Sequence, residues 1–146
     1  VNVIGALRIT KALLPNLRAN GKSHIVVVTS TAGHGVYENG GSYTSAKHAE
    51  LAFAQTLRLE LNGEPIRITE IAPGMVKTEE FSVSRLGSPE AAERVYEGVA
   101  EPLTAEDIAE TIRWSVTLPA HVNIDSLIVR PVAQAANHKV HRVKKY

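Results

Sequence analysis

The chain has 146 residues, of which 44% are hydrophobic and 21% charged, and its formal net charge is +1 at pH 7. These values are typical of one globular domain, and so small a net charge argues against broad electrostatic binding of nucleic acid or anionic lipid. The lack of cysteine excludes disulfides and thiol catalysis. No apolar run is long enough to cross a bilayer, so we expect a cytoplasmic protein whose partners include neither nucleic acid nor a membrane.

Helical and strand-like patterns alternate in the first half of the chain. Apolar residues at helical spacing predict a helix over residues 1–20, and "HIVVVTS" at 24–30 predicts a strand buried on both faces. Residues 31–42 contain four glycines and predict a loop. A second helix should follow at 43–61, and "IRITEIA" at 66–72 predicts a second strand.

The second half continues this alternation. "SPEAAERVYEG" predicts a helix that starts at a serine cap and ends before a glycine. "TAEDIAETIRWSVTL" has the spacing of a capping box and predicts another helix, and "DSLIVRP" predicts a third strand followed by a polar tail. Because strands alternate with helices, we expect an α/β fold with a parallel sheet in a single domain.

Polar residues gather where the predicted strands end. Ser30 ends the first strand, and Pro73-Gly74 directly follows the second. Ligands of open parallel sheets bind beyond the carboxyl ends of the strands. The helix that carries Tyr43 and Lys47 begins at the same edge, and residues four apart share one helix face. The sequence therefore predicts a ligand site at this edge, with Tyr43 and Lys47 acting on one small space.

Five features in chain order resemble the short-chain dehydrogenase/reductase family: "VN" at 1–2, "TSTAG" at 29–33, Tyr43, Lys47, and "APGMVKT" at 72–78. The resemblance implies a Rossmann-type doubly wound parallel sheet with helices packed on it. The glycine-rich phosphate-binding turn of the family is absent. Residues 1–146 should therefore be the C-terminal catalytic part of one such domain, with about three strands and without the N-terminal dinucleotide-binding half.

The resemblance also implies roles for individual residues. Tyr43 would exchange a proton with the substrate oxygen, because a nearby lysine cation favours the phenolate of a side chain whose ordinary pKa is about 10. Lys47 would in addition hold the nicotinamide ribose, and Ser30 would polarise the substrate oxygen. Asn2 would position a water that links Lys47 to a proton relay.

The loop after the second strand is implied to bind the nicotinamide carboxamide through residues Pro73, Gly74, Val76 and Thr78. Longer phrases, including "PGMVKTEEFS", resemble the branch that contains NADP-dependent 3-hydroxy acid and serine dehydrogenases. That branch implies a small hydroxy acid or carbonyl substrate, NADP with NAD not excluded, and a homo-oligomer. Arg85 is the candidate for the substrate carboxylate, because a guanidinium can pair with a carboxylate bidentately.

Plainer interpretations exist for each residue alone. Tyr43 could simply pack at a helix start, and Lys47 could be an exposed helix lysine, but the joint pattern favours the enzyme. The alternative function is a truncated chain without turnover that serves as an interaction or scaffold module. His138 and His141 lie in the basic tail without acidic or thiol neighbours, so we predict no metal site there.

Overall fold

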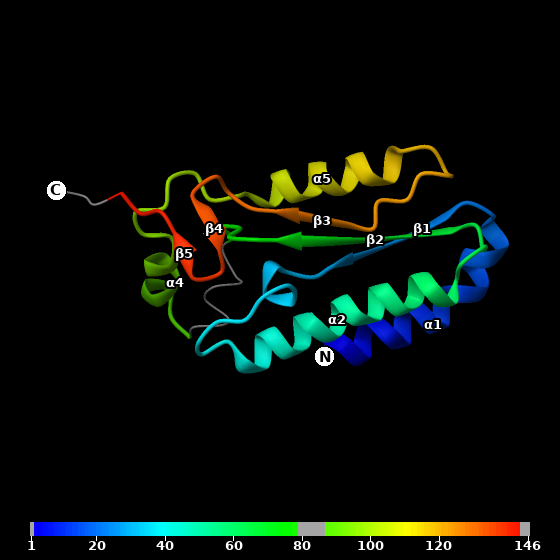
Figure 1. The fold of residues 1–146 in the computed structure, drawn as a ribbon, viewed down its shortest axis with the longest axis horizontal. Helices are drawn as coiled ribbons and strands as arrows, with labels where there is room; N and C mark the ends of the chain where they lie inside the picture. The colour runs from blue at the N-terminus through cyan, green and yellow to red at the C-terminus, as the bar shows by residue number, and fades with distance from the viewer. Residues whose placement is uncertain (1, 79–86, 144–146) are drawn as a thin grey trace.

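A computed structural model describes residues 2–78 and 87–143 of the chain. Its main sheet is parallel and has the strand order β1 (Ser23–Val28), β2 (Ile66–Pro73) and β3 (Ser126–Val129). In Figure 1 the three strands run side by side, and their carboxyl ends point to the same side of the molecule. The predicted α/β sheet of about three parallel strands is confirmed.

Helices cover both faces of this sheet. Helices α1 (Asn2–Asn20) and α2 (Gly41–Glu60) lie together on one face, and α5 (Ala105–Thr117) lies on the other (Figure 1). The short helix α4 (Pro89–Tyr96) sits beyond the carboxyl ends of the strands. This two-sided layering is the doubly wound arrangement that the sequence predicted.

Local sequence explains where the helices begin. The Ser88 side chain accepts a hydrogen bond from Ala91 N at the start of α4. Thr104 and Asp107 form the predicted reciprocal capping box at the start of α5. Such caps satisfy backbone N–H groups that have no partner inside the helix.

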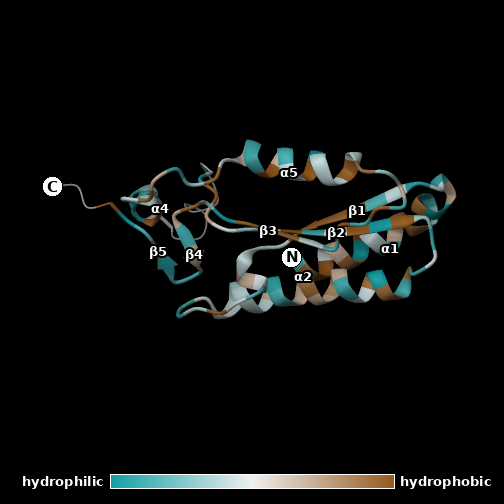
Figure 2. Cartoon of the chain, turned by 45° about the horizontal axis from the view of Figure 1, so that its top comes forward, coloured by the Kyte–Doolittle hydropathy of each residue, from teal (hydrophilic) through white to brown (hydrophobic). Residues whose placement is uncertain are grey.

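The apolar core lies between β1, β2 and the helix pair. Its buried members are contributed by α2, β2 and the turn between them: Ala54, Leu57, Leu61, Ile66 and Ile68. Figure 2 shows hydrophobic residues along the strands, between the helix layers. Phe53 of α2 and two leucines of α1, Leu14 and Leu17, pack against this core, so the two helices share it. Within the described residues, no helix has the length and apolar character needed to cross a membrane.

The first strand is shorter than the sequence predicted. Strand β1 ends at Val28, and the chain then turns through a short 3-10 helix, η1 (Thr31–Gly33). Ser30 is the N-cap of this turn, and its Oγ accepts a hydrogen bond from Ala32 N at 3.1 Å. The prediction that Ser30 ends a strand and that 31–42 is only loop was therefore wrong in detail.

The predicted polar tail is also wrong, because the described part of it forms an antiparallel pair, β4 (Gln134–Ala136) and β5 (Lys139–Val140). Distant contacts hold this hairpin in place. Gln134 Oε1 accepts a hydrogen bond from Met75 N at 2.9 Å. Asn137 Nδ2 donates to the carbonyl oxygens of Thr31 and Gly35, each at 3.1 Å.

His24 makes the stability of the fold depend on pH. Desolvation by burial, followed by the charge of Arg67, lowers the pKa of His24 from 6.5 to about 4. Below pH 6.5 the unfolded chain therefore takes up a proton that the folded chain takes up only near pH 4. Stability from this group is complete above about pH 6.5 and is lost as the pH falls toward 4, by on the order of 1 kcal/mol because the ring is only partly buried.

Urea unfolding at several pH values measures this effect. We expect the difference in unfolding free energy between pH 7 and pH 4.5 to be smaller in His24→Gln than in the wild type. An unchanged pH dependence in His24→Gln would assign the loss to other groups.

Candidate active site

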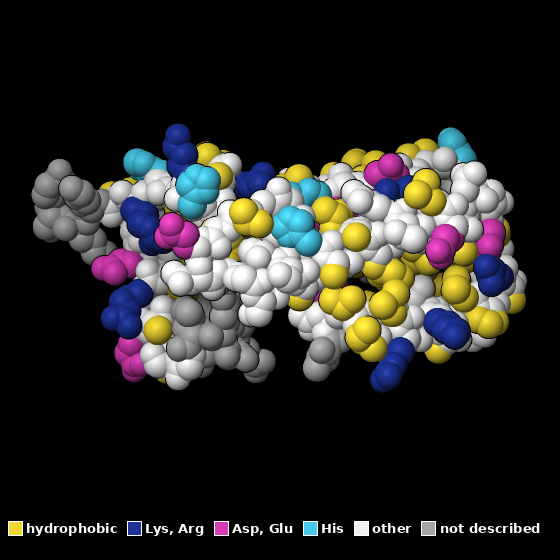
Figure 3. All heavy atoms as spheres, turned by 60° about the horizontal axis from the view of Figure 1, so that its bottom comes forward, with side chains coloured by type: hydrophobic (Ala, Val, Ile, Leu, Met, Phe, Trp, Pro, Cys, Tyr) yellow, Lys and Arg dark blue, Asp and Glu magenta, His cyan; other side chains and the backbone are white. Residues whose placement is uncertain are grey.

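The carboxyl ends of β1 and β2 and the start of α2 surround a cavity of about 590 Å³. Figure 3 shows a hollow in the surface between the helix layer and the part of the molecule that holds the hairpin. Eight of the nine predicted site residues line this cavity: Asn2, Ser30, Tyr43, Lys47, Pro73, Gly74, Val76 and Thr78. The ninth, Arg85, lies outside the described residues. Segments far apart in the sequence therefore converge on one space.

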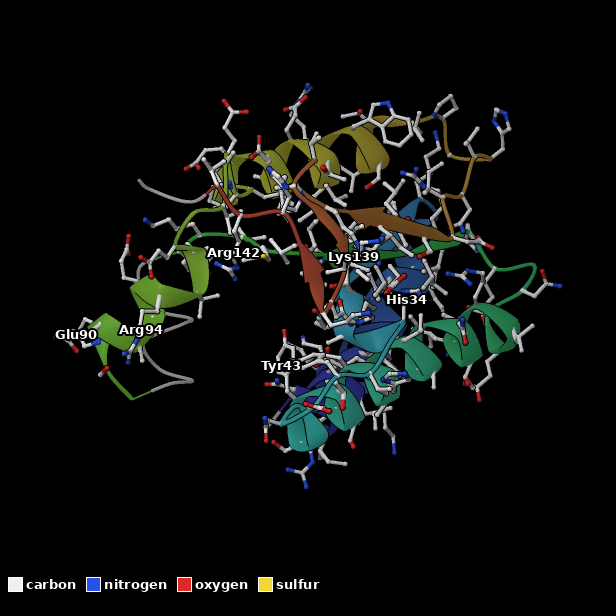
Figure 4. The ribbon with its side chains drawn as sticks, turned by 60° about the vertical axis from the view of Figure 1, so that its left-hand side comes forward. His34, Tyr43, Glu90, Arg94, Lys139 and Arg142 are labelled. Atoms are coloured by element: carbon white, nitrogen blue, oxygen red, sulfur yellow. The ribbon has the colours of Figure 1, made fainter. Side chains whose placement is uncertain are left out.

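Helix α2 presents Tyr43 and Lys47 to the cavity. The helix begins at Gly41, so Tyr43 lies in its first turn, as Figure 4 shows. Lys47 Nζ lies 5.9 Å from the centroid of the Tyr43 ring. At this distance the ammonium can interact with the aromatic ring.

A carboxyl group that the sequence analysis missed lies beside Lys47. Lys47 Nζ donates a hydrogen bond to Glu50 Oε2 at 2.7 Å, and the two side chains are only 12% and 7% exposed. Glu50 is three residues further along α2, a spacing that itself predicts contact. The ammonium also lies 3.4 Å from the carbonyl oxygen of Val28, at the end of β1. These contacts fix Lys47 between the helix and the sheet.

The turn that carries Ser30 packs tightly against α2. A β-carbon added to Gly33 would lie 2.9 Å from the backbone oxygen of Lys47. Only glycine permits this approach without a shift of the backbone. Ser30 Oγ also lies 3.4 Å from the carbonyl oxygen of Pro73. The 3-10 turn is therefore packed against α2 at Lys47, and the Ser30 hydroxyl lies at the end of β2.

The hairpin supports the loop after β2. Gly74 N donates a hydrogen bond to Val129 O at 2.7 Å, and a β-carbon at Gly74 would overlap Gln134 Oε1 at 2.2 Å. Gln134 in turn accepts from Met75 N. The glycine is therefore needed because the hairpin side chain approaches the loop so closely.

Helix α4 braces the next residues of this loop. Tyr96 is buried, and its hydroxyl donates a hydrogen bond to Val76 O at 2.8 Å. Arg142 donates to the carbonyl oxygens of Val95 and Glu97 at the end of α4, which joins the hairpin to the helix (Figure 4). The sequence alone indicates no role for these residues, because their contacts join positions too far apart for a local pattern to reveal them.

Comparison with known proteins agrees with this geometry. The family model described as short chain dehydrogenase matches residues 1–87, which is more than half of the chain. The chain belongs to the short-chain dehydrogenase family. This confirms the resemblance that the sequence motifs indicated.

Individual relatives place the chain within the family. It is 52% identical over 136 residues to an uncharacterised oxidoreductase of Mycobacterium tuberculosis (strain H37Rv), with 92% of this chain and 53% of the relative covered. It is 41% identical over 140 residues to an NADP-dependent 3-hydroxy acid dehydrogenase of Salmonella typhi, with 94% and 56% covered. It is 42% identical over 142 residues to a serine 3-dehydrogenase of Agrobacterium fabrum, with 97% and 56% covered. The chain thus spans about half the length of these curated relatives.

A solved structure gives the same result for the fold. The closed form of a serine dehydrogenase complexed with NADP+ matches with a TM-score of 0.88 at 39% sequence identity. The match covers 97% of this chain and 58% of the solved chain. The chain therefore resembles the NADP-dependent 3-hydroxy acid and serine dehydrogenases in both sequence and fold.

Proposed function

We propose that this chain is the catalytic half of an NADP-dependent dehydrogenase that interconverts a small hydroxy acid and the corresponding oxo acid. The observation that carries the proposal is the convergence of Ser30, Tyr43 and Lys47 on one cavity, beside the loop that follows β2. The names of the relatives support the choice of NADP and of a hydroxy acid.

The chain's own residues would handle the proton. In the oxidation direction the phenolate of Tyr43 takes the proton of the substrate hydroxyl, while the Ser30 hydroxyl donates a hydrogen bond to the same oxygen. A bound NADP+ would supply the acceptor for the hydride that leaves the alcohol carbon. Lys47 favours the phenolate before the transfer, and Asn2 positions a water through which the proton leaves.

The cavity has the right chemistry for the nicotinamide end of the cofactor. Its volume of about 590 Å³ lies within the roughly 300–1,000 Å³ of small-molecule sites. Lys47 supplies a cation for ribose hydroxyls, and the Thr78 hydroxyl and the backbone at Val76 supply polar groups for a carboxamide. Tyr96 fixes the Val76 carbonyl, so the backbone there is held in place for this task.

The open edge of β1 supports the proposal that another segment completes the sheet. Strand β1 pairs with β2 alone within the described parts of the chain, and Val28 is 45% exposed. Large apolar side chains on α1 are also exposed, among them Ile4, Leu7 and Ile9. Exposed strand edges and apolar patches favour association. We assign the edge to pairing with a dinucleotide-binding half and the helix face to a homo-oligomer contact in the cytoplasm.

The test is an assay of the full-length protein with NADP+ and a panel of small 3-hydroxy acids, followed by absorbance of the reduced nicotinamide. We expect turnover with at least one of these acids and weaker turnover with NAD+. Tight NADP+ binding without turnover of any alcohol, hydroxy acid or carbonyl would refute the dehydrogenase and favour the interaction module.

Arg85 gives the proposal a specific prediction about the substrate. A guanidinium can bind the substrate carboxylate through two parallel hydrogen bonds. Replacing Arg85 with alanine should therefore raise the KM for a hydroxy acid at least about 10-fold, because a charged hydrogen bond contributes roughly 1.5–3 kcal/mol. The KM for an uncharged alcohol of similar size should change little, and equal increases for both substrates would remove Arg85 from this role.

A further inference from the structure

We propose that Glu70 is a positioning residue that fixes the turn carrying Ser30. The inference rests on the proposed function, because it concerns the hydroxyl that would polarise the substrate oxygen. Glu70 lies in the interior of β2 and is 0% exposed. A buried carboxyl group is costly unless it is hydrogen-bonded, so its partners indicate what it is there to hold.

Both oxygens of Glu70 have partners, and the two oxygens face different elements. Thr29 Oγ1 donates a hydrogen bond to Oε1, and His34 Nε2 lies 2.8 Å from the same oxygen, within hydrogen-bond distance. Ser126 Oγ donates to Oε2 from the start of β3. One oxygen therefore faces the segment around Ser30, and the other faces the neighbouring strand.

The two partners of Oε1 lie on either side of Ser30. Thr29 immediately precedes Ser30, and His34 is the C-cap of the 3-10 turn for which Ser30 is the N-cap. The turn is closed by a hydrogen bond from Gly33 N to Ser30 O at 2.8 Å. On this side, the hydrogen bonds of the Glu70 carboxyl group go to Thr29 and His34. Glu70 holds both ends of the short segment in which Ser30 lies, from the rigid frame of β2.

The sheet alone does not require an acid at this position. An apolar side chain of similar volume is often as stabilising in a buried site as a hydrogen-bonded charged group. A carboxyl group, however, accepts hydrogen bonds in defined directions, which fixes the orientation of its donors. Pro73, three residues further along β2, lies next to the Ser30 hydroxyl itself. Strand β2 thus fixes the position of both the 3-10 turn and the Ser30 hydroxyl.

The experiment compares variants on the two sides of Glu70 in the full-length protein. His34→Leu and Thr29→Val remove donors on the turn side, and Ser126→Ala removes the donor on the β3 side as a matched control. His34→Gln retains a donor and serves as the rescue variant. For each variant, kcat, the KM for NADP and amide hydrogen exchange at Ala32 and Gly33 are measured.

We expect His34→Leu and Thr29→Val to lower kcat about 10-fold or more, because small misplacements of catalytic groups are costly, with the KM for NADP changed less than about 2-fold. Exchange at Ala32 and Gly33 should become faster in both. Ser126→Ala should leave kcat and this exchange near wild type, and His34→Gln should recover most of the kcat lost in His34→Leu.

Two results would overturn the positioning role. One is a kcat loss in Ser126→Ala equal to that in the turn-side variants, which would mean that Glu70 only stabilises the sheet. The other is wild-type exchange at Ala32 and Gly33 in both turn-side variants. A wild-type protein without any NADP-dependent turnover would refute the proposed function instead, and the exchange data would then decide the positioning role alone.

Discussion

Tyr43→Phe should lower kcat by about 100- to 10,000-fold, the range that general acid–base groups contribute. Phenylalanine keeps the ring and its packing at the first turn of α2 but cannot exchange a proton with the substrate oxygen. The ring also stays at the 5.9 Å distance from which Lys47 faces it. The change therefore separates proton transfer from the shape of the cavity.

Steady-state kinetics and a binding titration measure the effect in Tyr43→Phe. The Kd for NADP+ should stay within about 3-fold of the wild type, because only a hydroxyl is lost and the energy of one neutral hydrogen bond is small. Lys47, the proposed partner of the ribose, is unchanged in this variant. Residual kcat above about one tenth of the wild type would exclude Tyr43 as the group that moves the proton.

Gly33→Ala is expected to give the second largest loss. The added β-carbon would lie 2.9 Å from the backbone oxygen of Lys47, so the 3-10 turn must move away from α2. That movement separates Ser30 from Tyr43 and Lys47. We expect kcat to fall about 10- to 100-fold, since a displacement near 1 Å can cost 100-fold, and the unfolding free energy to fall by about 1–3 kcal/mol from overpacking.

Gly41→Ala is the matched control for this experiment. Gly41 is also close to the site, at the first residue of α2, but a β-carbon there meets no atom within 4 Å. We expect near wild-type kcat and unchanged or slightly higher stability, because alanine favours the helix. Similar losses in both variants would show that Gly33 is not a special contact between the turn and the helix.

The sequence was sufficient to predict which catalytic candidates meet. Tyr43 and Lys47 are one helical turn apart, Ser30 lies just after β1 and Pro73 ends β2, and the carboxyl ends of parallel strands share one edge of the sheet. The expected helices and the parallel sheet are confirmed for the same reason, since each depends on a local apolar pattern.

The hairpin could not be predicted in this way. Strands β4 and β5 have only three and two residues and lack a clear apolar alternation. Formation of this hairpin depends on contacts with residues far away in the chain, such as the hydrogen bonds of Asn137 to Thr31 and Gly35. A single sequence does not show which distant polar groups will pair.

The buried acids were missed for a related reason. Glu70 is an acid inside a predicted strand, which is a signal because acids are rarely buried without partners. The sequence does not identify those partners, because they come from the residue after β1, the start of β3 and the C-cap of the 3-10 turn. Glu50 was within reach of a local argument, through its three-residue spacing from Lys47.

The buried face of α2 couples the stability of the fold to the geometry of the proposed catalytic site. Leu57 and Ala54 anchor this face in the core, and Lys47 and Tyr43 lie on the same face about two and three turns before Ala54. A change in packing at Leu57 would rotate or shift the whole of α2, and Tyr43 and Lys47 would move with it. Substitutions intended to raise stability should therefore avoid this face and be made at exposed positions such as Leu59, which is 80% exposed.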